Sequence, residues 1–218
     1  MSESYRYAPE VFLHADPASA KAIILTCEQG LTPEERWDKE TDWLLGGAPP
    51  RIAFPAGALV LDYGCGIGRI AKQLPHTVLG VDISLTMRTQ AEVYVGRANF
   101  GGVNPAMLAE LAHFGLRCQG AVAVWVLQHC LNVAHDIQVI ASVLDRGASF
   151  VVVNRSNRAV PVTDGASLTW WNDGVDIDEL LSRHFIKQSE EAMPETLCAP
   201  GATMVHWQRN DVEAMAVP

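Results

Sequence analysis

The chain has 218 residues, of which 49% are hydrophobic and 19% charged, and it carries a formal net charge of -9. A globular chain of this length buries about 70% of the surface that its unfolded form exposes, so it needs no disulfides to hold a core. Excess acid repels phosphate backbones and anionic lipid head groups, which disfavours nucleic acids and membranes as partners.

The acid is concentrated at the two ends of the chain. Residues 1–57 carry nine acidic and five basic side chains, and residues 159–218 carry ten and three. The middle, residues 58–158, carries six and eight and is therefore slightly basic.

The five cysteines are scattered and form no Cys-x-x-Cys pair, and no histidine stands at zinc-ligand spacing beside them. We therefore expect free thiols in a reducing compartment and no metal site. The N-terminus has no signal-peptide pattern, and no segment reaches the roughly 18 apolar residues of a membrane span. These features predict a cytoplasmic protein.

The first predicted elements lie in residues 1–57. A short element is expected over residues 17–26 and a helix over residues 32–47. Thr32 can cap that helix, Pro33 suits its first position, Glu35 completes a capping box, and a glycine pair ends it. We interpret residues 1–57 as a helical extension that covers the following domain as a lid.

From residue 58 onward, apolar strands alternate with helices. Strands are predicted at 58–61, 78–83, 121–127 and 149–153, and helices at 67–74, 84–97 and 132–144. This alternation is typical of a parallel α/β sheet covered on both faces. Beyond residue 161 we expect a tryptophan-containing turn at 169–174, a helix at 177–185, and strands at 186–192 and 203–208. Residues 58–218 form the predicted main domain, and the protein is one domain overall.

The densest signal is Asp62-Tyr63-Gly64-Cys65-Gly66-Ile67-Gly68, which directly follows a buried strand and precedes a helix. Glycines at alternate positions let the backbone approach a ligand closely and point amide groups at it. Asp82 ends the next strand, where an acid can accept hydrogen bonds from both ribose hydroxyls. The pattern predicts a nucleoside-binding turn.

With these motifs the sequence resembles the class I S-adenosylmethionine-dependent methyltransferases. The resemblance continues through Gly80-Val81-Asp82-Ile83-Ser84, through Val124-Trp125-Val126-Leu127-Gln128-His129, and through residues 143–153. It implies a Rossmann-like, doubly wound, mostly parallel sheet of seven strands with helices on both faces and an antiparallel last pair. It also implies S-adenosylmethionine as cofactor, S-adenosylhomocysteine as product, and a small molecule as methyl acceptor.

The resemblance assigns cofactor contacts residue by residue. Gly64, Cys65 and Gly66 would lie against the methionine part, and Asp62 would organise the turn and reach toward the cofactor amine. Asp82 would hold the ribose diol, and Ile83 would pack on the adenine. Trp125 would also border the cofactor. The acid that usually caps the adenine amine from the third strand is absent, and Asn99 or Asn104 is a guess for its replacement.

Two further hypotheses concern catalysis and closure. His129, after the fourth strand, could act as a general base, or it could only hydrogen-bond a loop. Trp37, with Arg36, stands on the helix of the extension and could close over the cofactor. Tryptophans and carboxylates could alternatively cage a cationic amine, or the tryptophans could simply pack helices on the sheet.

Several alternatives stay open. The motif also fits a nicotinamide dinucleotide fold through Gly66, Gly68 and Ala71. A binding module without turnover is a second alternative, and nucleic-acid methylation a third, less favoured one. Because the flanks that would close over the acceptor are acidic, we expect a neutral or cationic acceptor. A monomer or homodimer is expected.

Overall fold

The computed structural model describes residues 5–14 and 16–210, and its centre is a sheet of seven strands. The order is β4-β3-β2-β5-β6-β10-β9, in which β10 runs antiparallel to both β6 and β9 and the other neighbouring strands pair in parallel. This confirms the predicted doubly wound sheet and its antiparallel last pair. The strands are β2 (Leu59–Tyr63), β3 (Thr77–Val81), β4 (Phe100–Val103), β5 (Cys118–Val124), β6 (Leu144–Arg155), β9 (Phe185–Ala192) and β10 (Ala202–Arg209).

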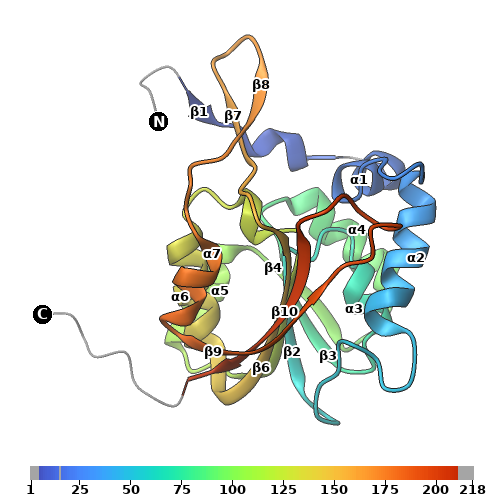
Figure 1. Cartoon of the computed structure of the whole chain (residues 1–218). Helices are drawn as coiled ribbons and strands as arrows, with labels where there is room; N and C mark the ends of the chain where they lie inside the picture. The colour runs from blue at the N-terminus through green and yellow to red at the C-terminus, as the bar shows by residue number, and fades with distance from the viewer. Residues whose placement is uncertain (1–4, 15, 211–218) are drawn as a thin grey trace, which may run out of the picture.

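Helices cover both faces of this sheet (Figure 1). One face carries helices α1 to α4 and the other carries α5 to α7, and each face has its own apolar cluster. Along β2, Val60 joins the first cluster and Leu61 the second, as expected for a strand buried on both sides. The helices are α1 (Pro17–Ile24), α2 (Pro33–Leu45), α3 (Arg69–Gln73), α4 (Leu85–Val95), α5 (Pro105–His113), α6 (Val133–Val143) and α7 (Ile177–Ser182).

Helix α2 begins as its sequence predicts. The Thr32 hydroxyl accepts from the Glu35 amide at 3.2 Å, and the Glu35 carboxylate accepts from the Thr32 amide at 2.9 Å. Such a capping box satisfies two amides that the first turn of a helix leaves without partners.

A second, three-stranded sheet was not predicted. Strand β1 (Arg6–Tyr7) pairs with β7 (Val160–Thr163), which pairs with β8 (Leu168–Trp171), both antiparallel. The interpretation of residues 169–174 as a turn therefore holds only beyond Trp171, because residues 169–171 belong to a strand. The β7–β8 hairpin extends away from the large sheet beside the N-terminal segment (Figure 1). The extension and the main domain are thus joined by strand pairing.

Among the described residues, no helix has the length and apolar character needed to cross a bilayer.

Candidate active site

A cavity of about 320 Å³ lies where β2, β3 and β5 end. In open α/β sheets, this carboxyl edge of the strands is where ligands bind. The cavity is mostly apolar, and residues of the N-terminal segment, among them Tyr7 and Phe12, line it as well. Its lining includes Gly64, Gly66, Asp82, Ile83, Trp125 and His129 of the predicted site.

The glycine turn joins β2 to α3 in a conformation that favours glycine. Gly64 and Gly66 have φ of 76° and 52°. A Cβ on Gly64 would stand 2.4 Å from the Val126 side chain, so no other residue fits without movement. The amides of Gly64 and Cys65 donate to the Val81 carbonyl oxygen, and the Gly66 amide donates to Asp82. These hydrogen bonds occupy the amides of the turn. The turn therefore serves a ligand mainly by letting it approach the backbone closely, and less by offering free amide groups.

Asp82 and Asp62 are the two acids of the motif, and they have different surroundings. The Asp82 carboxylate lines the cavity and accepts from the amides of Gly66 (3.0 Å) and Ser84 (2.8 Å). Each of its oxygens keeps a lone pair for a ligand hydroxyl. Asp62 is buried behind the turn, and its Oδ2 has no hydrogen-bond partner among the described residues. Burial raises the pKa of Asp62 to about 7 and also raises that of Asp82.

Cys65 and Ile83 differ in their access to the cavity. The Cys65 side chain is buried against Gly80 of β3 and does not line the cavity, and burial raises the pKa of its thiol. A thiol in that setting is unreactive. Ile83 lines the cavity and is 46% exposed, so its side chain offers a flat apolar surface at the rim.

Trp125 follows β5 in a strained backbone conformation. Its φ is 59°, which is unusual for a bulky side chain. Two hydrogen bonds hold it there: its amide donates to the Val153 carbonyl oxygen (2.8 Å), and its indole Nε1 donates to Glu40 (2.6 Å). The carboxylate of α2 therefore fixes a residue of the cavity wall.

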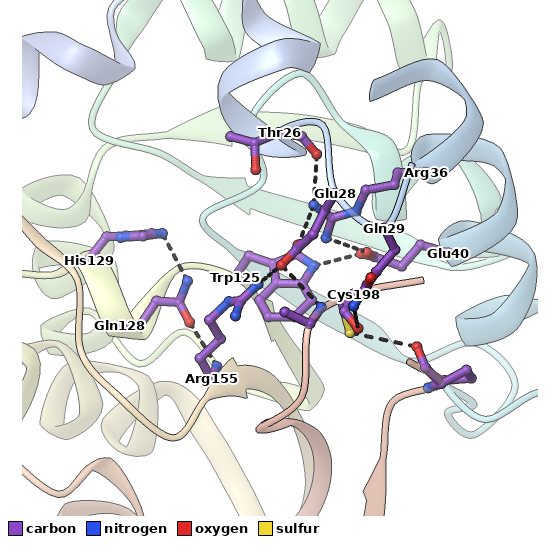
Figure 2. Close-up of polar contacts among 12 residues, drawn as sticks. Thr26, Glu28, Gln29, Arg36, Glu40, Trp125, Gln128, His129, Arg155 and Cys198 are labelled. Carbon is purple, nitrogen blue, oxygen red and sulfur yellow. Dashed lines mark hydrogen bonds and ion pairs between the residues drawn. The ribbon is translucent and has the colours of Figure 1, made fainter. Parts of the chain in front are cut away.

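Glu40 belongs to a buried ionic network that connects α2 to the sheet (Figure 2). Arg69 of α3 and Arg36 of α2 contact Glu40 at 2.9 and 3.2 Å. Arg36 also contacts Glu28 at 2.9 Å, and Glu28 pairs with Arg155 at the end of β6. The side chain of Arg36 is thus bound to the two carboxylates of the network and does not line the cavity.

Trp37 of α2 is buried among other side chains and does not reach the cavity. Its ring packs against Tyr94 and lies near the cationic groups of Lys21 and Arg69. It is 5% exposed and absent from the cavity lining. The geometry therefore favours helix packing for Trp37 over closure on a cofactor.

Both ring nitrogens of His129 have partners within the protein. Nδ1 lies 2.6 Å from the Ala159 carbonyl oxygen, which requires the proton on Nδ1, and Nε2 then accepts from the Gln128 amide at 3.0 Å. Burial lowers the pKa of His129, so the ring is neutral near pH 7. General-base action by His129 stays a prediction, and it requires Gln128 to release Nε2.

Three polar residues of the cavity were not singled out from the sequence. The Tyr63 hydroxyl donates to Asp136 of α6 at 2.7 Å, and Tyr7 reaches the same cavity from β1. Burial raises the pKa of Tyr63, and it raises that of Tyr7 to about 12, so both hydroxyls remain protonated donors. Tyr63 occupies a variable position of the motif, and only the fold brings it to Asp136.

Asn99 and Asn104 have structural partners. The Asn99 amide donates to the His76 carbonyl oxygen, and Asn104 Oδ1 accepts from the Met107 amide as the cap of α5. Neither residue lines the cavity.

The comparison with protein families agrees with this geometry. Residues 61–152 match the model of a methyltransferase domain. This part of the chain is therefore similar to a methyltransferase domain. The match spans β2 through most of β6, the segment that holds the glycine turn and Asp82, and it confirms the resemblance that the motifs carry. No curated protein matches the sequence.

Solved structures share this fold at low sequence identity. An S-adenosylmethionine dependent methyltransferase from Mesorhizobium loti is 20% identical with a TM-score of 0.56, over 79% of this chain and 100% of that one. The N-methyltransferase NodS from Bradyrhizobium japonicum WM9, in complex with S-adenosyl-L-homocysteine, is 10% identical with a TM-score of 0.56, over 89% and 93%. The cyclase SpnF is 15% identical with a TM-score of 0.60, over 85% and 86%.

Proposed function

We propose that this protein transfers a methyl group from S-adenosylmethionine to a small-molecule acceptor that is neutral or cationic. The observation that carries the proposal is the cavity itself, in which the glycine turn, Asp82 and Ile83 meet at the carboxyl edge of the sheet. When bound, S-adenosylmethionine supplies a methyl group on a sulfonium sulfur, open to direct in-line displacement by an acceptor lone pair.

The residues of the cavity suit that cofactor. Asp82 has unused acceptor capacity for a ribose diol, and Ile83 offers an apolar surface for the adenine. Asp62 lies behind the turn and outside the cavity lining, so its carboxylate would attract an ammonium group at the turn without contacting it.

The charge of the cavity limits the acceptor. Two carboxylates, Asp82 and Asp136, line it, and no lysine or arginine is among its described lining residues. An anionic acceptor would therefore meet repulsion with no counter-charge, whereas a neutral or cationic one would not. This supports the expectation from the acidic flanks.

The chain then catalyses mainly by alignment and by exclusion of water. The apolar walls and the N-terminal residues Tyr7 and Phe12 enclose the reacting groups, and holding two reactants in line removes much of the entropic barrier. A neutral amine needs no general base for its attack on the methyl group, which is compatible with the bonded state of His129.

A second candidate function is a binding module or an enzyme of different chemistry. The fold neighbour SpnF is named a cyclase, so this fold does not by itself require methyl transfer. Cofactor binding without any methylated product would favour this candidate.

Calorimetry with S-adenosylmethionine, S-adenosylhomocysteine and NAD tests the cofactor, and labelled methyl transfer to a metabolite extract and to tRNA tests the acceptor. We expect binding of the first two ligands and label in the neutral or cationic metabolites. Asp82→Asn should weaken binding by at least tenfold, while Asp164→Asn, at an exposed turn, should not. Preference for NAD, or label in tRNA alone, would contradict the proposal.

A further inference from the structure

Asp136 is a second carboxylate in the wall of the cavity, and it stands in the first turn of α6. Its side chain is only partly buried, so a ligand in the cavity can reach it. Oδ1 accepts from the Tyr63 hydroxyl at 2.7 Å. Tyr63 is itself buried at the end of β2, so its hydroxyl fixes the carboxylate against the sheet. A carboxylate offers about four lone-pair positions, and Asp136 therefore keeps acceptor capacity for a ligand.

The start of α6 lies at the same end of the cavity as the start of α5. The Asp82 amide donates to the Val103 carbonyl oxygen at 3.2 Å, which brings Pro105, the first residue of α5, next to the end of β3. Helices α5 and α6 pack side by side on one face of the sheet (Figure 1). Ile83, Pro105 and Asp136 all line the cavity, and they border this end of it.

Asp82 and Asp136 are also close enough to act on the same hydroxyl group. Burial is the main cause that raises the pKa of Tyr7 to about 12, and the charges of Asp136 and Asp82 both add to it. Tyr7 lines the cavity from β1. The two carboxylates thus face the same part of the cavity, one from the end of β3 and the other from the start of α6.

This end of the cavity suits the base of the cofactor. Under the proposed function Asp82 binds the ribose, so the adenine would lie against the neighbouring apolar side chains of Ile83 and Pro105. The 6-amino group of adenine is a hydrogen-bond donor, and a donor that leaves water needs an acceptor. Asn132, also at the start of α6, uses its Oδ1 as the cap of that helix. Among the described side chains at this end, Asp136 is the carboxylate that remains.

We propose that Asp136 is a further cofactor-binding residue, which accepts a hydrogen bond from the adenine 6-amino group, and that Tyr63 is its positioning residue. This inference rests on the proposed function, because it takes S-adenosylmethionine as the ligand. The sequence left the role to Asn99 or Asn104, and both have other partners outside the cavity. A carboxylate is a stronger acceptor than an amide, and it repels an oxo group, so the site selects a 6-amino over a 6-oxo purine.

Calorimetry of the full-length protein with S-adenosylhomocysteine and with S-inosylhomocysteine, in which an oxo group replaces the adenine amine, tests the assignment. The wild-type protein should bind the amino ligand at least about tenfold more tightly than the oxo ligand. Asp136→Asn keeps an oxygen for the Tyr63 hydroxyl and adds an amide that can donate to the oxo group, so the ratio of affinities should fall to about one or below. Asp164→Asn, at an exposed turn, is the control and should keep the wild-type ratio.

Tyr63→Phe removes only the hydroxyl that holds Asp136, so it should lower the same ratio by a smaller factor. Because the ratio compares two ligands on one variant, a general loss of stability leaves it unchanged. Equal binding of the two ligands by the wild-type protein, or a wild-type ratio in Asp136→Asn, would overturn the inference and leave the proposed function intact. An unchanged ratio in Tyr63→Phe would overturn the positioning role of Tyr63. Failure of the wild-type protein to bind either ligand would overturn the inference together with the proposed function.

Discussion

Asp62 is a buried carboxyl group whose pKa the fold raises toward neutral pH. Burial raises its pKa from 3.8 to about 7, against the opposing effects of a backbone hydrogen bond and of Arg69. Because the folded state holds the proton more tightly than the unfolded chain, Asp62 favours folding at low pH. This contribution is lost as pH rises from about 4 to about 7 and is constant above that range.

We expect Asp62→Asn to remove this dependence. Relative to the variant, the wild-type protein should become less stable between pH 4 and pH 7, with no further change above pH 7. Thermal unfolding of both proteins across this range measures the difference.

The ligand supplies the control for this prediction. Under the proposed function, saturating S-adenosylmethionine places an ammonium group near the turn. It should therefore reduce the difference in stability between the wild-type protein and Asp62→Asn at pH 8. A stability difference that does not vary with pH would show that folding does not raise the pKa of Asp62.

At the scale of elements, the ionic network makes α2 part of the cavity wall. Glu40 is fully buried and receives Trp125 and Arg69 on one oxygen and Arg36 on the other. Without it, the buried guanidinium group of Arg69 loses its carboxylate partner, that of Arg36 keeps only Glu28, and the strained Trp125 loses its anchor. Breaking one side of a buried ion pair costs about 3–5 kcal/mol.

Glu40→Gln should therefore lower Tm and weaken S-adenosylhomocysteine binding together. Trp125→Phe, which keeps the ring and removes only the indole donor, should weaken binding with a smaller loss of Tm. Calorimetry and thermal unfolding measure both effects. Glu179→Gln, in the exposed pair with Arg183, is the matched control and should change stability by about 0–1 kcal/mol. Unchanged ligand affinity in both the Glu40 and the Trp125 variants would show that α2 does not shape the ligand cavity.

The elements that sequence predicted are those with local signals. The capping box of α2 and the apolar runs of β2 (residues 59–61) and β5 (residues 121–124) are visible within a few residues. Strand β1 has only two residues and exists because β7 lies beside it, and β4 contains two glycines, which are poor strand formers. Such elements depend on tertiary pairing that a local pattern does not contain.

The same distinction applies to the site. Asp82 and the glycine turn were predicted, because their chemistry and spacing are local. Tyr7 and Asp136 enter the cavity from elements far apart in the chain, so no motif marks them. Arg36 and Trp37 were expected at the cofactor for their position on the lid helix, yet ion pairing and packing direct both side chains away from the cavity.

At the scale of the whole molecule, the N-terminal extension and the β7–β8 hairpin of the main domain meet beside the cavity. The N-terminal strap, residues 5–14, contributes β1 to the small sheet, and Phe12 of the strap contacts two rings from later in the chain. Its ring centroid is 5.7 Å from that of His129 and 6.2 Å from that of Trp170, and these two are 5.4 Å apart. The aromatic cluster thus attaches the strap to the wall of the cavity and to β8.

Phe12→Ala should loosen this attachment and speed the escape of a bound ligand. Aromatic pairs contribute about 0.5–1.5 kcal/mol beyond area burial, so the dissociation rate of S-adenosylhomocysteine should rise about 2- to 10-fold. Trp170→Ala should have a similar effect, and the double variant should show less than the product of the two, because both remove the same contact. Phe114→Ala, at a ring that is 80% exposed on the opposite helix layer, is the control and should leave the rate unchanged. Stopped-flow measurement of ligand release tests this prediction. Equal rates for the Phe12 and Phe114 variants would mean that the strap does not retain the ligand. A faster release confined to the variants of the aromatic cluster would mean that the strap closes the cavity.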